Sequence, residues 1–209
     1  QYLADSYRDV KPFDTRSLPE PLLPGTEVPD PEDYERYAMS DSGVSPRLVP
    51  GMGPYLVVSD SDEHGPDGHI TEDHYVRVRM QNKRQRKFWV LWEDIVPPEL
   101  DGDAEPEELL VCWGSTLGPV KEAAALLRST GRRVATLHFS QVWPLKEELF
   151  LPVMETAGEV VCVEGNSTGQ FASLIRRETG FQVQRRVLRY DGLPFTALYI
   201  LDRLGVKIA

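Results

Sequence analysis

The residues with the richest chemistry form one cluster of carboxylates and imidazoles. Groups of these types so close together can hold a divalent cation, although their spacing matches neither an HExxH helix nor an EF-hand loop. Two alternatives remain beside a metal site. One is a loop that is mobile or is ordered by a partner. The other is a substrate site lined by His64 or His69, where an imidazole can donate a hydrogen bond or move a proton. The cluster comprises Asp60, Asp62, Glu63, His64, Asp67, His69, Glu72, Asp73 and His74.

Two arginine-containing segments flank this cluster. Arg47 lies in Ser45-Pro46-Arg47, and its planar guanidinium can pair with a carboxylate through two hydrogen bonds. A solvent-exposed arginine is the alternative. The second segment is a basic tract, which is either a solvated helix face or a contact for an anionic ligand or an acidic subunit. It contains Arg77, Arg79, Lys83, Arg84, Arg86 and Lys87.

Two glycine-bounded turns are candidate anion sites, because each lies where a predicted strand leads into the amino terminus of a helix. The first holds Ser115 and Thr116 and the second holds Asn166 and Thr168. Neither turn has the GxGxxG or GxxxxGK[ST] spacing of a specific nucleotide site. A purely structural turn is therefore the alternative at both. Ser115 also lacks the Gly-x-Ser-x-Gly register of a hydrolase nucleophile.

The second half of the chain alternates strands and helices. Apolar runs of strand length without clean alternation, separated by helices, predict a parallel sheet that is covered on both faces. The fold class is therefore α/β, with a small, open, mostly parallel sheet. We expect strands at 109–113, 134–139, 159–164 and 187–190, and helices after 114–116, over 146–154 with an interruption at Pro152, from 170 to Gly180, and from about Thr196.

The first half has a different composition. Residues 1–106 hold 22 acidic and 11 basic residues and 13 of the 17 prolines, whereas residues 107–209 hold 11 acidic and 12 basic residues. We therefore expect an extended, proline-rich connector over 1–106 and a folded domain over 107–209. One helix is expected in the connector, at about 71–95, with Thr71 at its start and an inward face that contains Val76, Met80, Phe88, Leu91, Trp92 and Ile95.

The composition and the sequence pattern argue against several classes of function. A net charge of −10 makes nucleic acid an unexpected partner. No run is long and apolar enough to predict a membrane span, and Gln1 to Asp14 has no signal-peptide pattern. The absence of an initiator Met suggests a piece of a longer protein. Cys112 and Cys162 lie in apolar runs typical of buried thiols, which favours a cytoplasmic location.

Motifs along nearly the whole chain resemble the carboxyl-terminal part of the alpha subunit of 2-oxoacid:acceptor (ferredoxin or flavodoxin) oxidoreductases. The sequence departs from the family pattern at Met52, where a Thr is expected, and at Gly165, where Asn is common. The motif residues are 2–7, 12–14, 45–47, 50–51, 63–64, 68–73, Met80, 83–84, Lys87, 113–116, 118–119, 122–123, His138, 141–144, Glu164, 168–170, 174–176, 179–180, 190–192 and 194–195.

The resemblance implies an enzyme complex, most plausibly of the 2-oxoglutarate type, that decarboxylates a 2-oxoacid on thiamine diphosphate. Such complexes pass electrons through iron-sulfur centres to ferredoxin or flavodoxin and leave the acyl group on coenzyme A. Thiamine diphosphate and Mg²⁺ would be held by a beta subunit and by the rest of the alpha chain. This chain would then hold no cofactor and no catalytic residue, and would be inactive alone.

The resemblance also implies roles for the two halves. Residues 107–209 correspond to a transketolase C-terminal-like domain. Arg47, His64, His69 and Thr71 become candidate substrate-side contacts. The competing interpretations are a non-catalytic α/β module for subunit docking, in which Ser115, Thr116 and Asn166 only cap helices, and a nucleotide-binding Rossmann-like domain.

Overall fold

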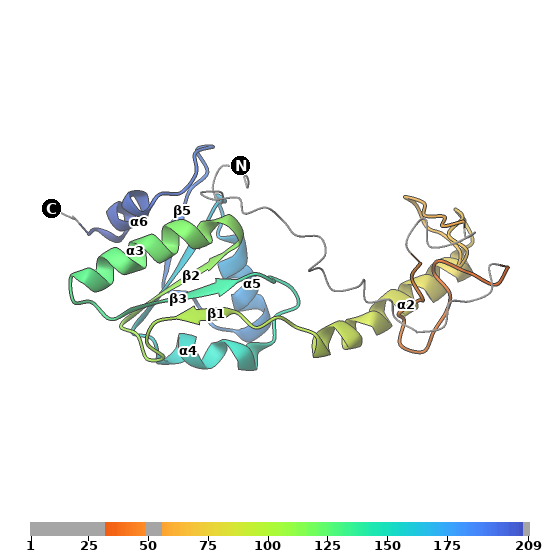
Figure 1. Ribbon diagram of the computed structural model, residues 1–209, viewed down its shortest axis with the longest axis horizontal. Coiled ribbons are helices and arrows are strands. Elements are labelled where there is room, and N and C mark those ends of the chain that lie inside the picture. The colour runs from red at the N-terminus through yellow and green to blue at the C-terminus, as the bar shows by residue number, and fades with distance from the viewer. Residues whose placement is uncertain (1–31, 49–55, 207–209) are drawn as a thin grey trace, which may run out of the picture. The chain divides into compact units, whose positions relative to one another are not determined.

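The computed structural model describes residues 32–48 and 56–206, and the chain divides into two compact units between Asp94 and Ile95 (Figure 1). The motif residues at 2–14 and 50–51, together with Met52, lie outside the described residues. Among the described residues, no helix combines the length and the apolar character that crossing a bilayer requires.

The second unit is built on a five-stranded sheet with the order β1-β3-β2-β4-β5. β2 to β5 run parallel to one another, and β1 pairs antiparallel with β3. The central strand β2 is buried along almost its whole length, which explains its continuous apolar sequence. The strands are β1 (Glu99–Asp101), β2 (Glu108–Trp113), β3 (Val134–Phe139), β4 (Glu159–Glu164) and β5 (Arg185–Leu188).

Helices cover both faces of this sheet. Leu109 and Val111 pack with residues of α4 and α5, whereas Leu110 and Cys112 pack with residues of α3 and α6. These two cores confirm the predicted α/β class with a small, open, mostly parallel sheet. The helices are α3 (Leu117–Ser129), α4 (Leu151–Thr156), α5 (Gln170–Thr179) and α6 (Ala197–Leu204), with short 3₁₀ helices at Gly114–Thr116 and Glu147–Leu149.

The structure differs from the predicted elements of the second unit in three places. The strand predicted at 187–190 lies two residues earlier, as β5 (Arg185–Leu188). The helix predicted over 146–154 is a 3₁₀ turn followed by the short α4, with Pro152 in its first turn, where a missing N–H costs nothing. Strand β1 was not predicted, because three residues carry no periodicity. Because β1 pairs with β3, the sheet includes residues that precede the boundary expected at 106/107 from composition. The compact unit begins at Ile95.

The first unit is organised by the long helix α2 (His74–Glu93). Thr71 was expected to start it, but the Asp73 carboxylate is the cap and accepts from the N–H groups of Tyr75 and Val76 at 2.7 and 3.2 Å. Of the predicted inward residues only Met80 is buried, and the second buried residue of α2 is Lys83. Leu91 is 44% exposed.

Candidate functional site

Helix α2 is the scaffold on which the segment around residues 40–48 is held. Gly43 has a φ of 79°, and a Cβ at this position would lie 2.3 Å from the carbonyl oxygen of Lys83. The chain can approach the helix so closely only without a side chain. Arg86 strengthens the contact by donating to the carbonyl oxygen of Ser40 at 3.1 Å.

Lys83 joins α2 to the Ser45-Pro46-Arg47 motif. Its side chain is buried, with 3% of the residue exposed, and Nζ donates to Ser45 Oγ at 2.5 Å. Ser45 Oγ in turn donates to the carbonyl oxygen of Ala38 at 2.9 Å. Burial, reinforced by neighbouring cations such as Lys87, lowers the pKa of Lys83 from 10.5 to about 8. This chain of hydrogen bonds fixes the backbone immediately before Arg47.

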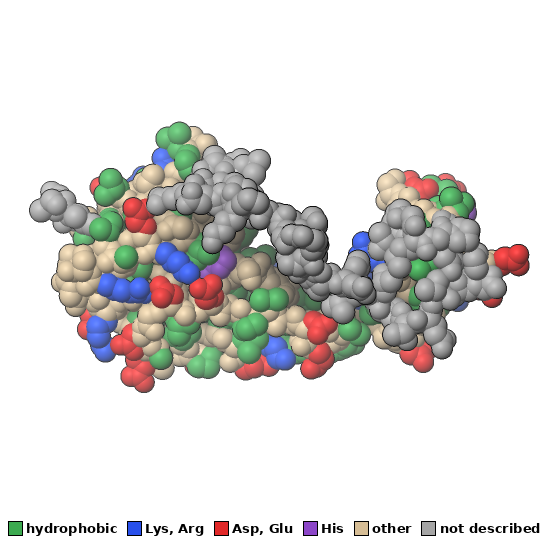
Figure 2. Space-filling view, viewed as in Figure 1, with side chains coloured by type: hydrophobic (Ala, Val, Ile, Leu, Met, Phe, Trp, Pro, Cys, Tyr) green, Lys and Arg blue, Asp and Glu red, His purple; other side chains and the backbone are tan. Residues whose placement is uncertain are grey.

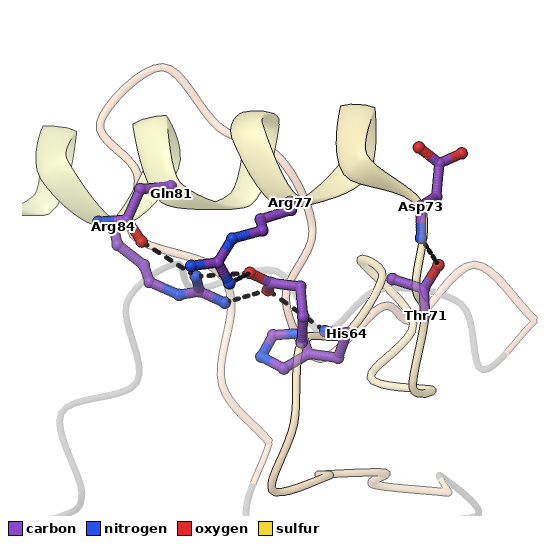
Figure 3. Close-up of polar contacts among 7 residues, drawn as sticks. His64, Thr71, Asp73, Arg77, Gln81 and Arg84 are labelled. Atoms are coloured by element: carbon purple, nitrogen blue, oxygen red, sulfur yellow. Dashed lines mark hydrogen bonds and ion pairs between the residues drawn. The ribbon is translucent and has the colours of Figure 1, made fainter.

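Glu63 attaches a second loop, which precedes the helix, to α2. Its two carboxylate oxygens accept from Arg84 at 2.5 and 3.2 Å, and Oε2 also accepts from Arg77 at 3.3 Å (Figure 3). The bidentate Arg84 contact is the main cause that holds the pKa of Glu63 below its ordinary value. Glu63 of the predicted cluster therefore forms one ionic contact with Arg77 and Arg84 of the predicted basic tract.

His64 is the most constrained imidazole in this unit. Its ring stacks on Tyr37, with centroids 3.9 Å apart and planes 25° apart, and the residue is only 8% exposed. Nδ1 lies 3.1 Å from the carbonyl oxygen of Gly65. Because a carbonyl can only accept, Nδ1 is the donor in this contact.

The other predicted contact residues differ in their surroundings. Thr71 is tied to the same loop, since its N–H donates to the Glu63 carbonyl at 2.9 Å and its Oγ1 accepts from the Asp73 N–H at 3.2 Å (Figure 3). His69 is turned toward Asp67, with Nδ1 3.0 Å from Oδ2. Arg47 is exposed, and within the described residues it makes no hydrogen bond with His64, His69 or Thr71.

The structure therefore brings His64 and Thr71 together in one loop, and it holds Arg47 on a separate segment of the same unit. Across residues 32–48 and 56–206, no group of three or more His, Cys, Asp or Glu side chains could hold a metal ion. Sequence reasoning missed Tyr37, and it placed Lys83 in the basic tract without predicting that this lysine is buried. Lys83 had a usable signal, because it follows Met80 by three positions on the helix, whereas Tyr37 had none.

The Asn166 turn in the second unit is satisfied by side chains of the chain itself. Asn166 Oδ1 accepts from the N–H groups of Thr168, Gly169 and Gln170 at 3.2, 2.8 and 3.2 Å. The fully buried Glu164 carboxylate accepts from the N–H groups at the start of α5, Phe171 at 2.7 Å and Ala172 at 3.0 Å. An internal carboxylate thus occupies the helix amino terminus, where an external anion would otherwise bind.

Ser115 and Thr116 lie at the other turn, beside a small cavity. Thr116 Oγ1 donates to the carbonyl oxygen of Trp113 at 2.7 Å. The cavity has a volume of about 130 Å³ and lies at the carboxyl ends of β2 and β4, where the order of the strands changes direction. Its lining comprises Trp113, Ser115, Thr116, Gly165, Arg189, Leu193 and Phe195.

Comparison with known proteins identifies relatives that match most or nearly all of this chain. The alpha subunit of 2-oxoacid:ferredoxin oxidoreductase 2 from Aeropyrum pernix is 33% identical over 209 residues, which cover 98% of this chain and 32% of the relative. The 2-oxoglutarate oxidoreductase subunit KorA from Mycobacterium tuberculosis is 32% identical over 136 residues, or 64% of this chain and 19% of the relative. The chain thus spans about a third or less of these relatives.

A solved structure and a domain family agree with these relatives. The 2-oxoglutarate:ferredoxin oxidoreductase from Magnetococcus marinus, solved with 2-oxoglutarate, coenzyme A and succinyl-CoA bound, matches with a TM-score of 0.64 and 28% identity. The match covers 82% of this chain and 30% of that one. Residues 101–203 match the family described as the transketolase C-terminal domain. The chain is thus similar to alpha subunits of 2-oxoacid:ferredoxin oxidoreductases, and its residues 101–203 form a transketolase C-terminal-like domain.

Proposed function

We propose that this chain is part of the alpha subunit of a 2-oxoacid oxidoreductase that depends on thiamine diphosphate. The observation that carries the proposal is the similarity to the Aeropyrum pernix alpha subunit over 98% of the chain, because it includes both units. The complete complex would convert a 2-oxoacid, coenzyme A and oxidised ferredoxin into acyl-CoA, CO₂ and reduced ferredoxin. A 2-oxoglutarate-type substrate is supported by the names of two of the similar proteins.

The residues of this chain do not fit an iron-sulfur cluster, which needs more thiolates than the two cysteines provide. Both thiols are buried in the sheet, and burial raises the pKa of Cys112 to about 12. A beta subunit and the remainder of the alpha chain would hold the clusters, Mg²⁺ and thiamine diphosphate. Thiamine diphosphate supplies the carbanion chemistry in such complexes, and the protein supplies position and electrostatics.

The first unit would supply contacts on the substrate side. The Arg47 guanidinium would pair with a substrate carboxylate, since it is exposed and its backbone is held through Ser45 and Lys83. His64 would present a ring oriented by Tyr37 and Gly65, and His69 and Thr71 are further contacts from the same loop. In this proposal the second unit supports the neighbouring domains.

The decisive experiment uses a complex reconstituted from the complete alpha subunit and its beta subunit. Arg47→Ala should raise the apparent KM for a dicarboxylic 2-oxoacid about tenfold or more, because a charge-assisted pair to the carboxylate is lost. Arg79→Ala, at an exposed arginine of α2, is the matched control and should leave KM unchanged. Unchanged kinetics for Arg47→Ala would remove this residue from the site. Full turnover by a complex that lacks residues 1–106 would favour a docking module.

A further inference from the structure

Lys83 is a buried basic side chain that no carboxylate among the described residues neutralises. In the second unit, by contrast, seven described basic side chains form ion pairs with carboxylates, and acidic and basic side chains lie interspersed on the face drawn in Figure 2. Lys83 is only 3% exposed, and its Nζ donates to a neutral hydroxyl, that of Ser45. A buried ammonium group without an anionic partner is costly, so its position requires an explanation.

Several charged neighbours of Lys83 are cations. Two of them, Arg86 and Lys87, lie three and four positions further along α2, a spacing at which residues are neighbours on a helix. A third, Arg36, comes from the segment that packs on this helix. The Arg36 guanidinium and Lys83 Nζ lie over the same ring, 4.9 and 5.9 Å from the centre of Tyr37. These cations repel an ammonium group at Lys83, and they would attract an anion there.

The Glu63 carboxylate contacts the same stretch of α2, but it is already engaged. It accepts from Arg84 at 2.5 and 3.2 Å and from Arg77 at 3.3 Å (Figure 3). Lys83 itself lies just below the surface, because Ser45, whose Oγ is 2.5 Å from Nζ, is partly exposed. A small neutral molecule therefore has a short path to the amine.

The surroundings of Lys83 also make the amine reactive. Burial and the neighbouring cations lower its pKa to about 8, so an appreciable part of the population is uncharged near neutral pH. An uncharged lysine is a nucleophile, and burial beside other cations is one of the ways in which proteins activate it.

We propose that Lys83 is a site of reversible carbamate formation with CO₂. The lone pair of the uncharged Nζ forms a bond to the carbon of CO₂, one C–O π bond breaks to give a carboxylate, and one proton leaves the nitrogen for solvent. The side chain thereby changes from a cation to an anion, which Arg36, Arg86 and Lys87 would stabilise. The N–H that remains can keep its hydrogen bond to Ser45. The step needs only dissolved CO₂, so it stands independently of the proposed function.

The test exposes the 209-residue chain to ¹³C-labelled bicarbonate at about pH 8, where dissolved CO₂ and the uncharged amine coexist. A carbamate resonance is expected in the ¹³C spectrum and should disappear on acidification. Triethyloxonium converts a carbamate into a stable ester, which peptide mass spectrometry then locates. The trapped mass should lie on Lys83. Trapping only on the terminal amine or on other lysines would overturn the proposal, and this result depends on no variant.

Variants test the role of the surroundings. Lys83→Met should remove the resonance of this site, and Lys87→Met should lower the trapped fraction at Lys83 about threefold or more, because a cation that stabilises the product is lost. Lys121→Met, at a lysine of the second unit that pairs with Glu99, is the matched control and should leave the fraction unchanged. Thermal unfolding verifies that each variant is folded. An unchanged fraction in folded Lys87→Met would also overturn the proposal, because the surrounding cations would then not stabilise the carbamate.

Discussion

Lys83 is held as a buried cation among other cations, which is an unfavourable position. Water cannot solvate its ammonium group, and Lys87, Arg36, Arg84 and Arg86 repel it, so its pKa falls to about 8. The Ser45 hydroxyl offsets part of this cost. A lysine in such a place makes stability depend on pH in the alkaline range.

The expected pH dependence follows from the proton count. Between about pH 8 and 10.5 the unfolded chain keeps the Lys83 proton while the folded chain releases it. The free energy of unfolding should therefore rise with pH in this window, by up to about 1.4 kcal/mol per pH unit. Denaturant unfolding at several pH values measures the slope. Lys83→Met should abolish it, and Arg79→Met, at an exposed position of α2 that is not among the cations lowering this pKa, should keep it; the same slope in Lys83→Met would contradict the assignment.

Glu63 is the complementary case of a carboxylate stabilised by its partners. Glu63→Gln should lower the free energy of unfolding by about 1–2 kcal/mol at neutral pH, because Arg84 and Arg77 lose a charged acceptor. The pKa of Glu63 is lowered in the folded state, so its contribution is complete above 4.5 and is lost as pH falls through the folded pKa. The two proteins should thus converge in acid. A constant difference down to pH 2 would show that the ion pair is not its source.

At the scale of elements, the turn between β4 and α5 is built by Glu164, Asn166 and Gly169. Glu164→Gln should lower the free energy of unfolding by about 2–4 kcal/mol. The buried carboxylate accepts from two backbone N–H groups and from the side-chain NH₂ of Asn166. A glutamine would put its own NH₂ donors in place of one of the two accepting oxygens. Glu178→Gln, at an exposed carboxylate of α5, is the control. Chemical denaturation compares the two variants, and equal costs would argue against the buried contact.

Gly169 and Gly180 flank α5 with similar positive φ values of 68° and 77°. Alanine at either position should cost about 1–2 kcal/mol through backbone strain, but only the Cβ at position 169 meets a neighbour, Arg186. Gly169→Ala should therefore cost more than Gly180→Ala. In an Arg186→Ala background the two costs should become equal. A difference that persists there would place the additional strain outside the Arg186 contact.

For the whole molecule, the question is where the folded second unit begins. Composition places the boundary at 106/107, whereas the sheet includes β1, and Arg128 donates to the Asp101 carbonyl at 2.7 Å and pairs with its carboxylate. A fragment of residues 95–209 should unfold cooperatively. A fragment of 107–209 should be less stable by about 1–3 kcal/mol, because it loses a strand and these bonds. Thermal and denaturant unfolding compare the fragments; equal stability would restore the compositional boundary.

The sequence alone was sufficient for the α/β class, strands β3 and β4 at their observed bounds, the end of α5 before Gly180 and the start of α6 after Thr196. These features depend on periodicity and on caps, which act within a few residues. The motifs also predicted the resemblance to alpha subunits, which the comparisons confirm.

Only the tertiary structure decided which polar groups are buried and what they contact. Helical spacing pointed to Leu91 as an inward residue, yet Lys83 is buried instead, because the loop with Gly43 and Ser45 packs over that turn of α2. Likewise, Glu164 accepts from amides seven and eight residues further along the chain. Such partners depend on how separate segments pack together, which a local pattern of residues does not predict.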